Sequence, residues 1–518
     1  MSELLTYDEY KAIAAELSLP VNAYVNGRFM KPKSGKTMDT FNPATGERLG
    51  KMAACDANDV DFAVRKAREA FDRGEWSRLH PRERKQVLIQ LGKLIKRHRH
   101  ELAVMESLES GKPIRECALT DVPETVHCIH WHAEATDKLY DQVSPSGDDA
   151  LGLVIREPAG VVGCVLPWNF PLMMLAWKIG PALSAGNSVI VKPAEQTSMT
   201  ALRVAELASE AGLPDGVLNI LPGEGPDVGE PLGRHDDVQV VSFTGSTEVG
   251  RRFLEYSAQS NLKRIVLECG GKNPAVVLSD AKNLDHAAKQ ITYAALWNMG
   301  QNCTANSRVI VHKNVRAELV DKIREQMRSW KTGDPLDPAN HLGAIVSQAQ
   351  YDKILAYIEK GKEEGADILE GGAALDAGAG LFIQPTLFDG VTPDMTIARE
   401  EIFGPVFAII EVTSDAHALA VANDTCYGLQ ASLFTSNVTT AHRFARALQA
   451  GTVSVNCYSE GDATTPFGGY KLSGFGGRDN SLQAHDQYCE TKTIWLDLSD
   501  DPVDDLIADD PASSPDRS

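Results

Sequence analysis

The residues best suited to chemistry begin with one cysteine, Cys303, which follows an apolar helical pattern at 284–296. The segment 297–304 reads WNMGQNCT, so the sulfur stands among small polar neighbours, with no carboxylate or second cysteine close in sequence. Attack by cysteine requires the thiolate, and this setting suits a thiol whose pKa is lowered. A lone cysteine is more often a small buried side chain. The prediction of a nucleophile therefore depends on partners supplied elsewhere in the chain.

One partner is a carboxylate, Glu268, which ends the apolar run 264–267 and precedes Cys269 and two glycines. A glutamate in this position is free to move and is partly removed from water, which suits a general base that activates a water molecule. The alternative interpretation is a strand-end glutamate with no chemical role.

A second partner is Asn169, in the segment 167–171 (PWNFP), which follows another apolar run. Its amide N–H can stabilise a developing oxyanion together with a backbone N–H near Cys303. Alternatively, Asn169 forms a turn between two prolines. Cysteine, base and oxyanion donor together predict covalent catalysis through a thiolate.

Polar residues after other apolar runs indicate a site for a dinucleotide. Glu195 follows the run 188–192 and can bind both hydroxyls of an adenosine ribose, while Lys192 can reach one of them. The alternative for this pair is a surface ion pair. In the segment 400–405, a carboxylate can bind the second ribose and Phe403 can rest against a nicotinamide ring.

The segment 243–250 (FTGSTEVG) places a glycine turn at the start of a predicted helix. The free N–H groups and the positive dipole end of such a helix can hold a phosphate. The segment is not the G-x-G-x-x-G fingerprint, so its spacing alone is weak evidence. Gly225, which follows a third apolar run, would let the backbone approach the cofactor.

A parallel sheet must position these residues. From residue 160 onward, nearly continuous β-branched runs alternate with helical patterns, which predicts parallel strands covered by helices on both faces. Ligands of such sheets bind at the carboxyl ends of the strands, where the polar residues stand. The predicted strands of this first set are 161–166, 188–192, 217–220, 238–243 and 264–267, with helices at 172–184 and 200–211.

A second set of strands, including 275–278, 309–311 and 452–455, predicts a second α/β domain from about 274 to 470. This domain carries Cys303, so we expect the site to lie in the cleft between the two domains. Before both sets, the chain has a polar beginning, a short strand pattern at 23–27, an alternating run at 151–156 and helical patterns at 57–72, 81–99, 101–110 and 122–139.

Composition excludes several classes of protein. With 518 residues, 43% of them hydrophobic and 24% charged, the chain predicts two or three globular domains. Its net charge of −20 argues against a nucleic-acid partner, and no apolar run reaches the roughly 18 residues that span a membrane. The first residues show no secretory pattern, and nine cysteines without close pairs fit a reducing compartment. We therefore expect a cytoplasmic protein.

The end of the chain has a different composition. Residues 500–518 contain seven aspartates, one arginine and three prolines, with few apolar side chains. Such a segment cannot bury enough apolar surface to fold. We expect an acidic tail, residues 499–518, to be disordered and solvated, without a docking role.

Several of these segments occur together, and in the same order, in one known superfamily. Over about residues 20–498 the chain resembles the NAD(P)-dependent aldehyde dehydrogenases, and its segments at 461–467 and 490–495 are most similar to the γ-glutamyl-γ-aminobutyraldehyde dehydrogenase branch. The segments that carry the resemblance are 167–171, 243–250, 268–272, 300–303, 400–405 and 466–471.

The resemblance implies a fold of three parts. These are a Rossmann-like parallel-sheet domain for NAD (NADP is possible), a second α/β catalytic domain, and a small β arm that joins subunits into a dimer or tetramer. No metal is implied. The corresponding residues are 1–136 and 157–270 for the cofactor domain, 271–482 for the catalytic domain, and 137–156 with 483–498 for the oligomerisation arm.

The resemblance also implies roles for individual residues. The catalytic residues would be Cys303, Glu268, Asn169, Lys178 and Asp479. The cofactor would contact Leu166, Pro167, Trp168, Lys192, Glu195, Gly225, Gly229, Phe243, Gly245, Ser246, Val249, Gly250, Glu401 and Phe403. The substrate would contact Phe170, Trp177, Asn302, Glu460, Asp462 and Phe467. Two positions depart from the superfamily pattern: Cys269, where Leu or Ala is usual, and Asp479, where many members have Glu.

The implied reaction is oxidation of an aldehyde to its carboxylic acid through a thiohemiacetal and a thioester on Cys303. The acidic loop around Glu460 and Asp462 favours a substrate with an amino group, such as an ω-amino or γ-glutamylamino aldehyde of amine catabolism, and Gly461 leaves room for a long tail. The acidic loop also argues against an anionic semialdehyde as the substrate. A betaine-aldehyde or broad-specificity enzyme remains the alternative. Glu268 argues against a CoA-acylating enzyme, and its presence with Cys303 argues against a non-enzymatic protein.

Overall fold

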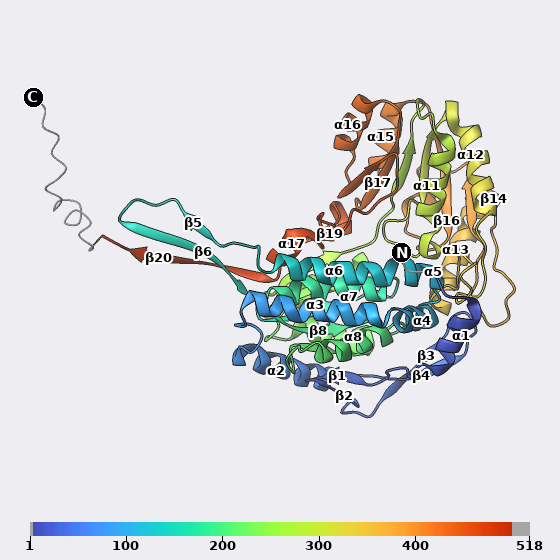
Figure 1. Cartoon of the computed structure of the whole chain (residues 1–518). Coiled ribbons are helices and arrows are strands. Elements are labelled where there is room, and N and C mark those ends of the chain that lie inside the picture. Colours follow the sequence, from blue (N-terminus) through green and yellow to red (C-terminus); the bar gives the residue numbers. More distant parts are fainter. Residues whose placement is uncertain (1–3, 500–518) are drawn as a thin grey trace, which may run out of the picture.

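Three sheets organise the chain, for which a computed structural model describes residues 4–499. Two of these sheets form separate lobes, and the third projects from the body as a long arm (Figure 1). The predicted acidic tail lies outside the described residues from position 500 onward. No helix within residues 4–499 is long and apolar enough to cross a membrane.

The sheet of the first lobe contains the first predicted set of strands. Its order is β19-β11-β10-β7-β8-β9-β1-β2, and its five central strands run parallel. These are β7 (Val161–Val165), β8 (Ser188–Lys192), β9 (Leu218–Ile220), β10 (Val240–Thr244) and β11 (Arg264–Glu268). The predicted strands are thus confirmed, with starts and ends within two residues. Antiparallel strands close the edges: β1 (Ala23–Val25), β2 (Arg28–Met30) and β19 (Gly474–Phe475).

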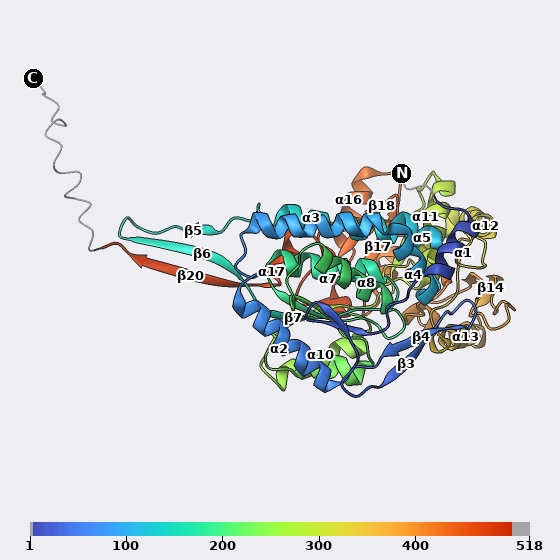
Figure 2. The ribbon, with the colours of Figure 1, turned by 60° about the horizontal axis from the view of Figure 1, so that its bottom comes forward.

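Helices cover both faces of this sheet, as the burial of its central strands on both faces requires. Figure 2 shows α2 (Ala57–Arg73) and α10 (Thr247–Ala258) on one side, with α3 (Pro81–Arg97), α7 (Pro171–Ser184) and α8 (Met199–Glu210) on the other. Every residue of α7 is buried, because α7 lies between the sheet and the outer helices α3 and α6 (Val122–Ala135). A lysine within α7, Lys178, is therefore held away from water.

The N-terminal third differs from its sequence prediction in four places. The polar beginning contains a helix, α1 (Tyr7–Glu16), which starts at a capping box between Thr6 and Glu9. The predicted helix 122–139 ends at residue 135. Before it, the chain forms α4 (Arg99–Ser110), a three-residue helix α5 (Ile114–Glu116), and a π-helical turn η1 (Cys117–Asp121) that periodicity alone did not indicate. A separate hairpin pairs β3 (Thr37–Phe41) with β4 (Arg48–Ala53).

The second lobe has its own sheet and core, as predicted. The strand order is β14-β15-β16-β13-β12-β17-β18, parallel except for the pair β14 and β15. The strands are β12 (Pro274–Val277), β13 (Arg308–His312), β14 (Asp367–Glu370), β15 (Thr386–Asp389), β16 (Val406–Val412), β17 (Gln430–Phe434) and β18 (Thr452–Val455). Its helices are α11 (Leu284–Leu296), α12 (Lys313–Arg328), α13 (Gln348–Glu363), α14 (Thr396–Arg399), α15 (Asp415–Asn423) and α16 (Val438–Ala447).

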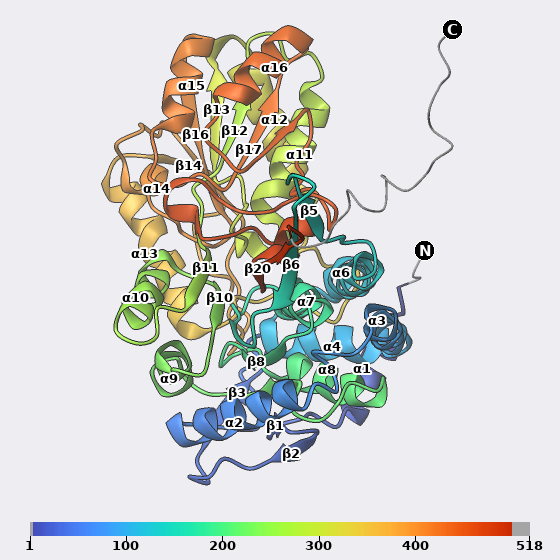
Figure 3. The same cartoon turned by 90° about the vertical axis from the view of Figure 1, so that its left-hand side faces the viewer.

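The arm is a three-stranded antiparallel sheet in the order β20-β6-β5. Its strands are β5 (Gln142–Ser144), β6 (Ala150–Pro158) and β20 (Cys489–Asp497), the last of which follows the short helix α17 (Ser481–Asp486). Figure 3 looks along this arm and shows the second lobe stacked above the first. Strand β19 lies within the sequence segment that we assigned to the catalytic domain, yet it pairs with β11 of the first lobe.

Candidate active site

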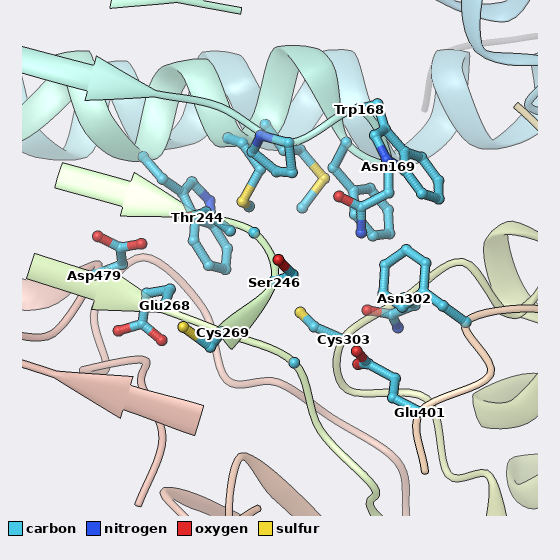
Figure 4. Close-up of a pocket in the computed structure, with 18 of the residues that line it drawn as sticks. Trp168, Asn169, Thr244, Ser246, Glu268, Cys269, Asn302, Cys303, Glu401 and Asp479 are labelled. Atoms are coloured by element: carbon cyan, nitrogen blue, oxygen red, sulfur yellow. The ribbon is translucent and has the colours of Figure 1, made fainter. Parts of the chain in front are cut away.

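A cavity of about 210 Å³ lies between the two lobes, and both lobes line it. The first lobe supplies residues that follow β7, β10 and β11, and the second supplies the segments around Cys303 and Glu401 (Figure 4). The carboxyl ends of the parallel strands thus face the cysteine, which is the arrangement that the sequence predicted.

A tight turn at the end of α11 presents Cys303. The helix ends at Leu296, and a single 3₁₀ turn (Trp297–Gly300) follows. Asn298 and Met299 both have left-handed backbone conformations, with φ of 51° and 55°. Non-glycine residues adopt this region rarely, and strain of this kind persists where surrounding contacts enforce it. The turn redirects the chain from the helix into the cavity, where Cys303 lies half-buried.

The surroundings of Cys303 contradict one sequence expectation. We expected a setting that lowers the pKa of the thiol, but burial raises the pKa of Cys303 well above its ordinary value, and the carboxylates of Glu460, Glu401 and Glu268 raise it further. The sequence near the cysteine contains no carboxylate, and the fold brings these three from distant segments. The protein alone therefore favours the neutral thiol.

Asn169 lies beside the cysteine turn, between the end of β7 and the start of α7. Its side-chain amide donates one hydrogen bond to the backbone carbonyl of Gln301, with an N–O distance of 3.0 Å. The side chain of Asn298 donates to the carbonyls of Asn169, at 2.8 Å, and Gln301, at 3.1 Å. An amide has two N–H donors, so Asn169 keeps one for the cavity, which it faces together with Cys303 (Figure 4).

Glu268 ends β11 and is only 3% exposed. Its carboxylate packs against Gly468 and points away from Cys303 (Figure 4), and neither oxygen has a hydrogen-bond partner among the described residues. Burial raises the pKa of Glu268 well above its ordinary value, the charge of Asp479 raises it further, and Lys178 opposes both. These properties suit a general base that moves toward a substrate.

Lys178 and Asp479 form a buried ion pair behind Glu268, with an N–O distance of 2.7 Å. Asp479 also lines the cavity, and its second carboxylate oxygen has no partner among the described residues. Its backbone pairs with that of Phe467. The pair connects the middle of α7 to the C-terminal segment and places one charged group of each sign next to the predicted base.

The predicted cofactor residues fall into three groups. Pro167, Trp168, Gly245, Ser246, Glu401 and Phe403 line the cavity. The side chains of Leu166 and Phe243 are buried in the core of the first lobe. The others, Lys192, Glu195, Gly225, Gly229, Val249 and Gly250, do not line this cavity and belong to the neighbouring region of β8, η2 (Gly225–Gly229) and α10.

This region fits a dinucleotide by the chemistry of its donors and acceptors. Helix α10 begins after Ser246, whose hydroxyl accepts the N–H of Val249 at 3.3 Å. The remaining free N–H groups of this helix start are the kind that bind a phosphate. Glu195 has an exposed carboxylate 3.5 Å from the Lys192 ammonium. Trp168 and Phe403 meet edge to face with ring centres 5.2 Å apart, beside Glu401.

The predicted substrate residues surround the other end of the cavity. Phe170, Trp177 and Phe467 form apolar walls, and the rings of Trp177 and Phe467 lie 5.0 Å apart. A second cavity of about 210 Å³, here called the outer cavity, adjoins the first and shares Met173, Trp177 and Glu460 with it. Asp462 lines only this outer cavity. The two cavities are therefore neighbours, and Cys303 lines the first of them.

The two carboxylates of the acidic loop differ in their bonding. Glu460 accepts hydrogen bonds from Thr304, from the Tyr458 hydroxyl at 3.1 Å and from the Asn302 amide at 3.4 Å. Burial raises the pKa of Glu460, and these donors oppose the rise. Asp462 instead accepts from the hydroxyl and the N–H of Thr464, which lower its pKa.

Sequence reasoning missed several residues of the site. Gln350, on α13, donates to the carbonyls of Ile402 and Phe403 and so holds the Phe403 turn against the cavity. Nothing in the pattern of α13 distinguishes it from an ordinary surface helix. The aromatic wall of the outer cavity was also missed, although Tyr458 stands only two positions before Glu460. The residues of this wall are Tyr293, Trp297 and Tyr458.

The fold and this arrangement agree with comparisons against known proteins. The chain belongs to the aldehyde dehydrogenase family, whose profile matches residues 29–494. The predictions of this family, of its α/β fold and of an NAD(P)-dependent aldehyde dehydrogenase are therefore confirmed.

Three individual proteins illustrate the similarity. An aminoacetaldehyde dehydrogenase of Pseudomonas aeruginosa is 58% identical over 499 residues, which cover 96% of this chain and all of that protein. The crystal structure of γ-glutamyl-γ-aminobutyraldehyde dehydrogenase from Burkholderia cenocepacia superposes with a TM-score of 0.94 at 47% identity, covering 95% of this chain and 100% of the other. An indole-3-acetaldehyde dehydrogenase of P. syringae, in complex with NAD⁺, has the same TM-score at 46% identity, covering 96% and 100%.

Proposed function

We propose that this protein oxidises an aldehyde that carries an amino or γ-glutamylamino group to its carboxylic acid, with Cys303 as nucleophile and Glu268 as base. The observation that carries the proposal is the meeting of Cys303, Asn169 and Glu268, from three separate elements, in one cavity between the lobes. The names of two relatives support the substrate class, because one acts on aminoacetaldehyde and another on γ-glutamyl-γ-aminobutyraldehyde.

The proposed reaction follows from the positions of the side chains. The Cys303 thiol first loses its proton to solvent water, and the thiolate then attacks the carbonyl carbon. The free N–H of Asn169, with the Cys303 backbone N–H, stabilises the resulting oxyanion. NAD(P)⁺, when bound, supplies the acceptor for the hydride that leaves this carbon. Glu268 then turns toward the thioester and takes a proton from a water molecule, which attacks and releases the acid and the Cys303 thiol. The ion pair of Lys178 and Asp479 places one positive and one negative charge next to Glu268.

We also propose that NAD⁺ is preferred over NADP⁺. The exposed Glu195 carboxylate is suited to accept hydrogen bonds from both ribose hydroxyls. A 2′-phosphate at the same place would meet a like charge and would have no hydroxyl to donate. Lys192, buried beside Glu195, reduces this penalty because its ammonium can approach a phosphate.

The outer cavity supports an amino group on the substrate. Glu124 and Asp462 line it, and donors from Thr464 keep the pKa of Asp462 below its ordinary value, so this carboxylate is charged at neutral pH. The aromatic faces of Tyr293 and Trp297 add favourable contacts for a cation. An ammonium group that follows the aldehyde by a few carbons would therefore meet both kinds of partner. A quaternary ammonium, as in betaine aldehyde, could use the aromatic faces but could not donate hydrogen bonds.

The substrate proposal is tested by kcat/KM for 4-aminobutanal, its γ-glutamyl derivative and butanal, in the wild type and in Asp462→Asn. We expect the preference for 4-aminobutanal over butanal to fall about fivefold, corresponding to about 1 kcal/mol for a partly hydrated charge. Asp394→Asn is the matched control, because Asp394 also accepts a threonine hydroxyl, from Thr392 at 2.6 Å, but lies outside both cavities. Equal selectivity in wild type and Asp462→Asn would contradict the proposal.

The arm supports a homo-oligomer, a dimer or a tetramer. It extends away from both lobes, and Trp495 on β20 is 60% exposed, with Ile494 and Leu496 also exposed. An exposed apolar strand at a sheet edge is a template for pairing with another chain. We accordingly propose 137–156 and 483–498 as the oligomerisation arm, 1–136 and 157–270 as the cofactor domain, and 271–482 as the catalytic domain.

The free thiols of all nine cysteines support a cytoplasmic location.

A further inference from the structure

A buried carboxylate outside the proposed catalytic set contacts the cysteine turn. Glu116, the last residue of α5, accepts a hydrogen bond from the backbone N–H of Asn298, with an O–N distance of 3.2 Å. The two residues are 182 positions apart in the chain. Asn298 is the first residue of the left-handed pair in the turn. The bond therefore fixes one peptide of the strained segment that precedes Cys303.

The residue whose N–H binds Glu116, Asn298, also aligns the oxyanion site through its side chain. The Asn298 side chain donates to the carbonyls of both Asn169 and Gln301. The Asn169 amide donates to the same Gln301 carbonyl. A rotation of Asn298 would thus move the predicted oxyanion donor and the segment that carries Cys303 at the same time. A change of about 1 Å in such a site can reduce the rate about 10²-fold.

We propose that Glu116 is a positioning residue: by holding the Asn298 peptide in its left-handed conformation, it aligns Asn169 with Cys303 for attack on the aldehyde. This inference rests on the proposed function, because it assigns Glu116 to the acylation half of that reaction. Glu116 contacts neither substrate nor cofactor in this arrangement, since it does not line the inner or the outer cavity.

The electrostatic surroundings show that packing alone does not explain Glu116. Burial raises its pKa to about 8, Lys112 opposes the rise, and Asp121 adds to it. Lys112 is itself fully buried, pairs with Asp121 and lies 3.9 Å from the centre of the Phe170 ring. A buried carboxyl is unfavourable unless its interactions compensate. An apolar side chain would fill the same volume without that penalty but could not bind the Asn298 N–H.

The test compares two substitutions by the rate of the first NADH turnover in stopped-flow experiments. Glu116→Gln keeps an oxygen acceptor, so we expect a rate within about threefold of wild type. Glu116→Leu removes the acceptor, and we expect the first turnover to slow by about 10- to 100-fold. The dissociation constant of NAD⁺ should stay the same in both variants. If Glu116→Gln keeps the wild-type rate and Glu116→Leu does not, the hydrogen-bond acceptor, and not the volume of the side chain, is what positions the turn.

Glu109 provides the matched control. It is also buried, and its carboxylate accepts the N–H groups of Met199 at 2.9 Å and Thr200 at 3.3 Å, at the start of α8. It has no bond to the cysteine turn. We expect Glu109→Leu to lower the melting temperature while the folded enzyme keeps the wild-type first-turnover rate. A comparable slowing in Glu109→Leu would mean that loss of any buried carboxylate disturbs the site, and would overturn the proposal.

A third variant keeps the test decisive if Glu116→Leu does not fold. Asn298→Gly allows the left-handed conformation but removes the side-chain donors to Asn169 and Gln301. We expect a slowing similar to that of Glu116→Leu, and a wild-type rate in Asn298→Gly would overturn the alignment argument. If wild-type enzyme itself gives no NADH from any aldehyde, the proposed function fails. If wild type turns over and Glu116→Leu equals it, only the role of Glu116 fails.

Discussion

Replacing Glu268 by glutamine separates the two halves of the proposed reaction. Neither oxygen of the Glu268 carboxylate has a hydrogen-bond partner among residues 4–499, so the substitution breaks no bond to the protein. A neutral amide is also easier to bury than a carboxylate. We therefore expect Glu268→Gln to be as stable as the wild type or more so. Any loss of activity then reports chemistry and not unfolding.

The expected loss falls on the second half-reaction. The Cys303 thiol can lose its proton to solvent water, so neither the attack nor hydride transfer needs a base at Glu268, whereas release of the acid does. Loss of a positioned general base typically reduces a rate by about 10²- to 10⁴-fold, which raises the barrier by about 3 to 5 kcal/mol. Glu268→Gln should produce about one NADH per active site in a rapid burst and then continue slowly, with the acyl group on Cys303.

The pH dependence gives a second readout from the same variant. The pKa of Glu268 lies well above the ordinary value, because of burial first and the charge of Asp479 second. Only the ionised carboxylate can accept a proton, so wild-type deacylation should decrease as pH falls through this raised pKa. Glutamine does not titrate, and the same limb should be absent in Glu268→Gln.

Stopped-flow absorbance of NADH measures the burst, and mass spectrometry of the quenched protein measures the acyl group. Cys303→Ala with Glu268→Gln is the control, since it should give neither a burst nor an added mass. Steady turnover of Glu268→Gln at the wild-type rate, with no accumulated acyl-enzyme, would refute the role of Glu268. It would show that another group activates the water.

Three further outcomes are expected. Cys303→Ala should form no NADH from any aldehyde while NAD⁺ still quenches tryptophan fluorescence, and turnover near the wild-type rate would point to another nucleophile. Glu195→Gln should reduce the ratio of kcat/KM for NAD⁺ to that for NADP⁺, and a wild-type preference for NADP⁺ would contradict the ribose assignment. Trp495→Asp on the arm should lower the oligomeric state measured by light scattering, and an unchanged mass would argue against the arm as an interface. Phe41→Asp on β3 is the control, because it places a new charge on an exposed aromatic position outside the arm.

Much of the fold followed from local pattern. The β-branched runs became parallel strands because such runs are stable only when buried on both faces, and the polar residues after them gathered at one edge because parallel strands end together. The sequence alone therefore located Cys303, Asn169 and Glu268 in one cleft. It did not indicate the π-helical turn after Glu116, since a single extra residue per turn leaves no periodicity to detect.

The electrostatics and fine positioning of the site depended on tertiary structure. The sequence around Cys303 has no carboxylate, yet Glu460 and Glu401 come from segments about 100 or more positions away and raise the pKa of its thiol. The bond from Asn298 to Glu116 likewise joins residues that no local pattern connects. Residue type and spacing determine which chemistry is possible, because they set the available groups and the strand ends that carry them. Burial and the distances between charges determine how those groups ionise and align, and both exist only once the lobes have packed together.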